Sequence, residues 1–94
     1  MMIVRHSFIA KPGQAGKLAA QMKEIASVGK LRNVRVLTDV TGDFNHVVME
    51  HDVEAMAEFE EAMKRYSSDP AIHEKAKGYT EHWITGRRDL FRVV

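Results

Sequence analysis

The chain has no cysteine, no long apolar run and no excess of one charge, and each shortage excludes a class of protein. Without cysteine there is no disulfide framework, no thiol nucleophile and no thiolate metal site, a composition that fits a reducing compartment. No apolar run approaches the roughly 20 residues of a membrane-spanning helix, and the first residues do not resemble a signal peptide. We therefore expect a cytoplasmic protein without a membrane partner.

Charge is balanced along the whole chain. Fourteen lysines and arginines against thirteen acidic residues leave a net charge of +1, and no run of like charge is longer than Arg87-Arg88. Nucleic-acid-binding domains carry a basic patch, so no nucleic-acid partner is expected. The sequence also lacks a phosphate-binding loop, a nucleophile elbow, a zinc-protease helix and a dinucleotide-binding fingerprint. At 94 residues the chain is long enough to form one domain, residues 1–94, with its own core.

Residues 34–51 are typical of a β-hairpin, in which Gly42-Asp43 is expected to form a two-residue turn. This turn places Thr41 opposite Phe44 and fixes which side chains share a face. One face is apolar and is expected to be the core side. The other face carries two cross-strand pairs of opposite charge, Arg35 with Glu50 and Asp39 with His46.

Hydrophobic periodicity, together with the residues that start and stop helices and strands, predicts the other elements. They are a strand over residues 2–10, a helix over 14–29, a helix over 52–66 with Asp52 as its N-cap, a helix from Asp69-Pro70 to about Thr85, and a closing strand over 87–94. In the first strand, alternation turns His6 toward the core. The order β-α-β-β-α-(α)-β predicts an α+β, ferredoxin-like fold, with a four-stranded antiparallel sheet and helices on one face.

The sheet face without helices is expected to expose apolar side chains. They are Ile3, Ile9, Leu37, Phe44 and Val48. Apolar patches of this kind usually mark interfaces. We therefore expect a homodimer formed sheet to sheet, a dimeric α/β barrel, with Arg35, Asp39, His46 and Glu50 inside it.

The carboxyl end, SSDPAIHEKAKGYTEHWITGRRDLFRVV, has an Asp-Pro helix start followed by aromatic residues and a final strand. In this and in its element order, the chain resembles the dimeric α/β-barrel superfamily, and in particular its NIPSNAP-like and antibiotic-biosynthesis-monooxygenase-like members. The resemblance implies a sheet-to-sheet homodimer and, in enzymatic relatives, a pocket between helices and sheet. The superfamily includes cofactor-free oxygenases, haem degraders and members without known activity, so it does not imply one reaction.

Haem degradation is not expected, and no cofactor is predicted. The haem-degrading relatives place an asparagine on an early strand and a tryptophan upstream of the helical histidine. Here the first strand has no asparagine, and Trp83 lies downstream of His73.

Few side chains are suited to chemistry, and each has a structural alternative. His73, beside the apolar stripe of the last helix, is the candidate acid or base, or else a partly buried structural histidine. Tyr79 and Trp83 either line a ligand site or fill the core. His6 and His51 face inward and are further candidates for the lining. The spacing of the three histidines carries no metal-ligand signal, so no metal site is predicted.

Two functions follow. The leading hypothesis is a small homodimeric, cofactor-independent, monooxygenase-like enzyme that acts on an apolar or aromatic small molecule. The alternative is a non-catalytic binding or assembly module of NIPSNAP type. A cavity of roughly 300–1,000 Å³ at His73 would favour the enzyme, whereas Tyr79 and Trp83 packed without a void would exclude it.

Overall fold

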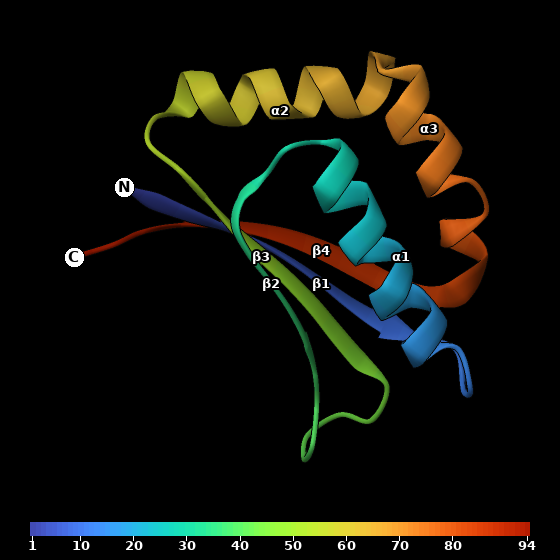
Figure 1. The fold of residues 1–94 in the computed structure, drawn as a ribbon. Helices are drawn as coiled ribbons and strands as arrows, with labels where there is room; N and C mark the ends of the chain where they lie inside the picture. Colours follow the sequence, from blue (N-terminus) through green and yellow to red (C-terminus); the bar gives the residue numbers. More distant parts are fainter.

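The computed structural model describes all 94 residues as one antiparallel sheet with helices on one face (Figure 1). The elements in chain order are β1 (Met2–Ala10), α1 (Ala15–Val28), β2 (Arg32–Thr38), β3 (His46–Val53), α2 (Met56–Ser68), α3 (Pro70–Ala76), the 3-10 helix η1 (Tyr79–His82) and β4 (Trp83–Arg92). The strand order across the sheet is β2-β3-β1-β4. The predicted ferredoxin-like fold is confirmed.

The core lies between the sheet and α1. The helix has an apolar face at helical spacing, and Leu18, Met22, Ile25 and Ala26 are buried there. Val47 and Met49 of β3, Ala10 of β1 and Ile72 of α3 complete this core. α1 ends at Val28 with Gly29 as its C-cap, close to the predicted boundary.

β1 is a central strand and alternates as predicted. Val4, His6 and Ala10 point to the helical side and are buried, and Phe8 points the same way and is half-buried. Arg5, Ser7 and Ile9 face the open side. β1 pairs with β3 and with β4, both antiparallel. His6 therefore lies inside the molecule, between Met49 of β3 and Arg88 of β4.

The hairpin register is confirmed, but the predicted two-residue turn is wrong. Arg35 lies opposite Glu50 and Leu37 opposite Val48, as expected. The connection is longer, residues 39–45, because Phe44 and Asn45 both adopt left-handed backbone conformations and take the chain out of the ladder. At the other end, a bulge between Arg32 and Arg35 breaks the predicted pairing of Val34 with His51.

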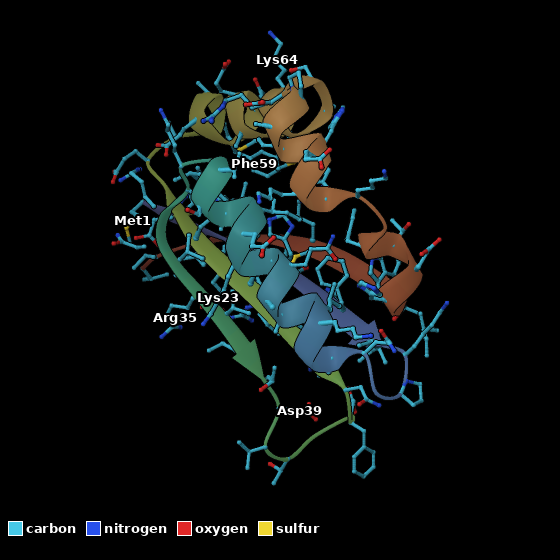
Figure 2. All side chains as sticks on the ribbon, turned by 45° about the vertical axis from the view of Figure 1, so that its right-hand side comes forward. Met1, Lys23, Arg35, Asp39, Phe59 and Lys64 are labelled. Carbon is cyan, nitrogen blue, oxygen red and sulfur yellow. The ribbon has the colours of Figure 1, made fainter.

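The second helix begins later than predicted, and its packing is loose. Asp52 is not its N-cap, because β3 continues to Val53, and Ala55 stands at the N-cap instead. No residue of α2 is buried. The helix crosses one end of the helical layer (Figure 1), with Phe59 on its inner side and Lys64 on its outer side (Figure 2). α2 is therefore a cover over the sheet, not part of the core.

The third helix is shorter than predicted. Asp69 caps it as expected, accepting a hydrogen bond from the backbone N–H of Ala71 at 2.9 Å, and Pro70 is its first residue. The helix ends at Ala76, because Gly78 takes a left-handed conformation with φ of 77°. Trp83 is consequently the first residue of β4, and Thr85, the predicted end of the helix, lies inside that strand. No helix is long and apolar enough to cross a membrane.

Candidate functional site

A small cavity of about 60 Å³ lies between the sheet and the helices, and ten of its fifteen lining residues are hydrophobic. Its polar or ionisable lining comes from three strands, α2 and η1: His6, His51, Arg65, Tyr66, Tyr79 and Arg88. The cavity has room for about two water molecules, well below the usual size of a ligand pocket. It is nevertheless the place where inward-facing polar side chains meet.

Strand alternation and strand pairing bring the two histidines together. His6 on β1 and His51 on β3 both point to the helical side, and the β1–β3 register places Val4 opposite His51 and His6 opposite Met49. The two rings are thus diagonal neighbours on adjacent strands. His6 is 8% exposed and His51 1% exposed.

The two imidazole rings meet edge to edge. Their Nε2 atoms are 3.4 Å apart, their ring centroids are 5.6 Å apart, and their planes differ by 15°. The centroid separation exceeds the Nε2–Nε2 separation by 2.2 Å. This difference is about twice the distance from a ring centre to one of its own atoms, so both Nε2 atoms lie on the line between the two ring centres. This geometry is that of a long hydrogen bond between the two rings and not of a face-to-face stack.

Arg88 sets the direction of this hydrogen bond. Its Nε donates to His6 Nδ1 at 3.3 Å, and since a guanidinium can only donate, His6 Nδ1 must accept. The proton of neutral His6 is then on Nε2, where it is donated to His51 Nε2. The network therefore assigns the proton of His51 to Nδ1. That Nδ1 atom is buried and has no hydrogen-bond partner.

Both histidines are held neutral. Burial, followed by the positive charge of Arg88 and by His51, lowers the pKa of His6 from 6.5 to about 3. Burial also lowers the pKa of His51, although the nearby backbone of Asp52 acts in the opposite direction. That backbone does not meet the geometry of a hydrogen bond with Nδ1, so His51 is left with a free donor at neutral pH.

Aromatic side chains close the cavity on the η1 side. Tyr79 packs edge to face against Tyr66 and Phe8, with ring centroids 6.4 Å apart in both pairs. Burial, followed by the neighbouring Tyr79 hydroxyl, raises the pKa of Tyr66, so Tyr66 stays a neutral phenol. Trp83 contacts Phe8 and Tyr79, at 5.4 and 6.2 Å between centroids, and is not part of the lining.

His73 lies apart from this site. It is an exposed residue of α3 and does not line the cavity, although the sequence predicted a position at the border of the apolar stripe. The difference follows from the short third helix, because only Ile72 of α3 is buried. No three histidine, cysteine, aspartate or glutamate side chains are grouped to hold a metal ion.

Sequence reasoning missed Arg65, Tyr66 and Arg88 as site residues. The alternation of side chains along a strand could have predicted Arg88. Its neighbours Arg87 and Asp89 face the open side of the sheet, so Arg88 faces the helical side. Arg65 follows Glu61 by four residues, a spacing typical of a solvated ion pair on a helix, but that ion pair is not formed: no carboxylate oxygen lies within 4.0 Å of its guanidinium.

A second, more polar hollow of about 160 Å³ adjoins the cavity. The two share five lining residues, namely Gly29, Leu31, His51, Ala62 and Arg65. Acidic residues line this groove, and one of them, Glu58, is bound to Arg32 at 2.9 Å. His51 and Arg65 thus stand at the boundary between an apolar cavity and a polar groove.

The open sheet face carries a separate charged cluster. Glu50 is 5% exposed, accepts a hydrogen bond from Arg5 Nε at 2.7 Å and another from Arg35 at 2.7 Å. These bonds, that of Arg35 first, lower the pKa of Glu50. Asp39 and His46 lie opposite each other, but the Asp39 carboxylate accepts from the backbone N–H of His46 at 3.0 Å and forms no ion pair with its ring.

This fold defines the protein as a small α+β protein of ferredoxin-like topology, and solved structures share it. No model of a known protein family and no characterised protein matches the sequence. A NIPSNAP domain protein from Burkholderia xenovorans superposes with a TM-score of 0.85 at 12% identity, over 100% of this chain and 95% of that one. A NIPSNAP family protein from Agrobacterium tumefaciens gives 0.83 at 10% identity, over 100% and 94%.

An antibiotic biosynthesis monooxygenase shares the fold as well. Its TM-score is 0.73 at 15% identity, over 100% of this chain and 99% of that one. The predicted structural resemblance to both kinds of protein is confirmed. At these identities the likeness shows a common fold and carries no activity.

Proposed function

We propose that the protein is a small homodimeric, cofactor-independent, monooxygenase-like enzyme that acts on an aromatic or otherwise apolar small molecule bound between α2 and the sheet. One observation carries this proposal. A buried, neutral histidine pair, His6 and His51, ends in an unpartnered N–H donor on a residue that lines a largely apolar cavity. A buried donor needs an acceptor, and the oxygen of a ligand bound in the cavity would supply one.

The chemistry assigned to His51 is stabilisation of an oxyanion. When a ketone with an acidic C–H₂ group loses a proton to water, the electron pair moves to the carbonyl oxygen and forms an enolate, which the Nδ1–H of His51 can bind. Dioxygen, the co-reactant, then adds to the carbon. The C–H₂ group becomes C=O and the second oxygen atom leaves as water, so that one dioxygen is consumed for each substrate.

Ligand entry requires α2 to move, since the cavity of about 60 Å³ is too small for an aromatic ring system. α2 is the helix most easily displaced, because its inner residues are only half-buried, whereas Leu18, Met22, Ile25 and Ala26 of α1 are buried. The adjoining groove, which shares His51 and Arg65 with the cavity, is the route by which the two hollows would merge.

The alternative function is a non-catalytic binding or assembly module of NIPSNAP type. The small volume of the cavity favours it, and so does the higher TM-score of the NIPSNAP structures, 0.85 against 0.73. In that case the aromatic cluster around Tyr79 serves as core packing.

Oxygen uptake separates the two functions and the two candidate histidines. We expect 2-tetralone, an aromatic ketone with an acidic C–H₂ group, to be oxidised with one dioxygen consumed per diketone formed. His51→Leu should lower turnover by roughly 10²–10³-fold, the usual effect of removing an oxyanion donor. His73→Leu is the matched control, an exposed histidine outside the cavity, and should leave turnover unchanged.

The opposite pattern, loss in His73→Leu and none in His51→Leu, would restore His73 as the acid or base predicted from the sequence. If a panel of aromatic ketones produces neither oxygen uptake nor a rise in melting temperature, the enzyme proposal is overturned and the NIPSNAP-type module is the better account.

A further inference from the structure

The cavity gathers positive charge and no negative charge. Arg65 and Arg88 both line it, and no aspartate or glutamate does. Of the other arginines of the chain, Arg5, Arg32, Arg35 and Arg87 each lie within 4.0 Å of a carboxylate, and Arg92, which does not, is exposed at the end of β4. Arg65 and Arg88 have no such partner. Two unneutralised guanidinium groups at one mostly apolar cavity are a charge imbalance that folding alone does not require.

The cavity lining holds several hydrogen-bond donors, and its two tyrosine hydroxyls can donate as well as accept. Arg88 uses Nε on His6, and its two terminal NH₂ groups make no hydrogen bond within the protein. The network leaves His51 Nδ1–H without an acceptor. The raised pKa of Tyr66 keeps its hydroxyl protonated, so it adds no negative charge. The occupant that such a site would complement is an acceptor that carries negative charge.

Carboxylates are present nearby, but not in the cavity. Glu58 and Glu61 line the adjoining groove. Both carboxylate oxygens of Glu58 accept hydrogen bonds from the guanidinium of Arg32, each at 2.9 Å. The carboxylates therefore line the groove and not the cavity, and Arg65 lies at the boundary between them. The charged side chains that line the cavity are all positive.

From this asymmetry we infer that the ligand of the site is an aromatic oxyanion, with its ring system in the apolar cavity beneath α2 and its oxygen or carboxylate between Arg88, Arg65 and the N–H of His51. This inference rests on the proposed binding site and narrows its ligand from apolar molecules in general to aromatic acids, phenolates and enolates. A planar carboxylate matches the fork of a guanidinium, which explains arginine in place of lysine at both positions.

A matched pair of ligands tests the charge alone. 2-Naphthoate and 2-naphthamide have the same ring system and nearly the same size, and only the first is an anion at neutral pH. In calorimetric titrations of the full chain we expect 2-naphthoate to bind at least about tenfold more tightly than 2-naphthamide, the range expected for one charge-assisted contact. Raising the salt concentration should weaken the acid and leave the amide unaffected.

Neighbouring arginines supply the control. Arg88→Gln should remove most of the preference for the acid, whereas Arg87→Gln should keep it, because Arg87 faces the open side of the sheet and pairs with Asp89 at 2.8 Å. Arg88→Lys retains the charge and should restore part of the preference. Melting temperatures of the variants show that each is folded before its affinity is compared.

The outcomes distinguish this inference from the proposed function. If 2-naphthamide binds as tightly as 2-naphthoate, the apolar site stands and the anion inference is overturned. If neither compound binds, the proposed site itself fails. If the acid binds preferentially but equally well to Arg88→Gln and Arg65→Gln, it binds elsewhere and the inference is again overturned.

Discussion

Protonation of His6 should make the protein sensitive to mild acid. His6 is buried on the inner side of β1, where Arg88 of β4 donates to it, His51 of β3 contacts it and Tyr66 of α2 lines the same cavity. Burial withholds the water that would solvate an imidazolium at His6, and the positive charge of Arg88 repels it. The folded protein therefore resists protonation of His6, whereas the unfolded chain does not.

The magnitude follows from the pKa of His6, which is about 3 in the folded state against 6.5 for an unperturbed histidine. Above pH 6.5 the ring is neutral in both states and stability is complete. Below it only the unfolded chain takes up the proton, so the free energy of unfolding falls by roughly 1.4 kcal/mol per pH unit until the pH nears the folded value. By pH 5 the loss is about 2 kcal/mol, a large part of a typical stability of about 5–15 kcal/mol.

Urea denaturation at pH 7.5, 6 and 5 measures this loss directly. The lowered pKa of His51 adds to the slope in the same direction. Glu50 acts at lower pH, because its pKa lies below the usual 4.5 and its contribution is complete above that value. His6→Gln should reduce the slope between pH 7.5 and 5. A free energy of unfolding that is constant over this range in the wild-type protein would refute the reasoning.

The other predictions concern the open face and a close contact. Sedimentation at micromolar concentration should give the mass of a dimer, because the apolar side chains of this face, such as Leu37 at 42% exposed, require cover; a monomer would contradict the proposed barrel. Glu50→Ala should weaken that dimer by more than about 1 kcal/mol, since it leaves Arg5 and Arg35 without their shared carboxylate; unchanged dimer affinity would place this face outside the interface. Gly86→Ala should cost about 1–3 kcal/mol in thermal or urea melts, because its Cβ would lie 2.9 Å from the ring of Phe8, and a melt identical to the wild type would rule out that contact.

The fold was predictable because its signals are periodic. Side chains alternate along a strand with period two, so the charged pair Arg35 and Glu50 and the inward direction of His6 follow from the sequence once a hairpin is assumed. The loop was not predictable in the same way. Gly42-Asp43 is a favourable turn pair, but left-handed conformations at Phe44 and Asn45 cost little enough for tertiary packing to override the local preference.

The third helix shows how a real signal can be outweighed. Gly78 is an ordinary helix stop, yet the aromatic stripe through Tyr79 and Trp83 continues at helical spacing and favoured a longer helix. In the structure the same two rings contact each other, with centroids 6.2 Å apart, from a 3-10 turn and a strand. The spacing of Tyr79 and Trp83 correctly predicted that their side chains are neighbours. It did not predict that one residue lies in a 3-10 helix and the other in a strand.

The candidate site was only half visible from the sequence. Alternation placed His6 and His51 on the same side of the sheet, but their contact depends on how β1 pairs with β3, which no local pattern contains. Arg88 depends in turn on β4 starting at Trp83 and pairing with the other edge of β1. The contact of His6 with His51 and that of Arg88 with His6 therefore require β1, β3 and β4, which are distant in sequence, to pair first.

The half-buried helix α2 and the N–H of His51 belong to the same part of the molecule, and the proposed ligand would contact both. Two apolar side chains in place of His6 and His51 would fill the same space without a buried, unpartnered donor, which costs roughly 1–3 kcal/mol. A helix with no buried residue above that donor adds little stability in return. Both features become favourable at once if a ligand oxygen accepts the N–H of His51 and the ligand's ring gives α2 an apolar surface to cover. Binding should therefore order α2 and raise the stability of the whole chain.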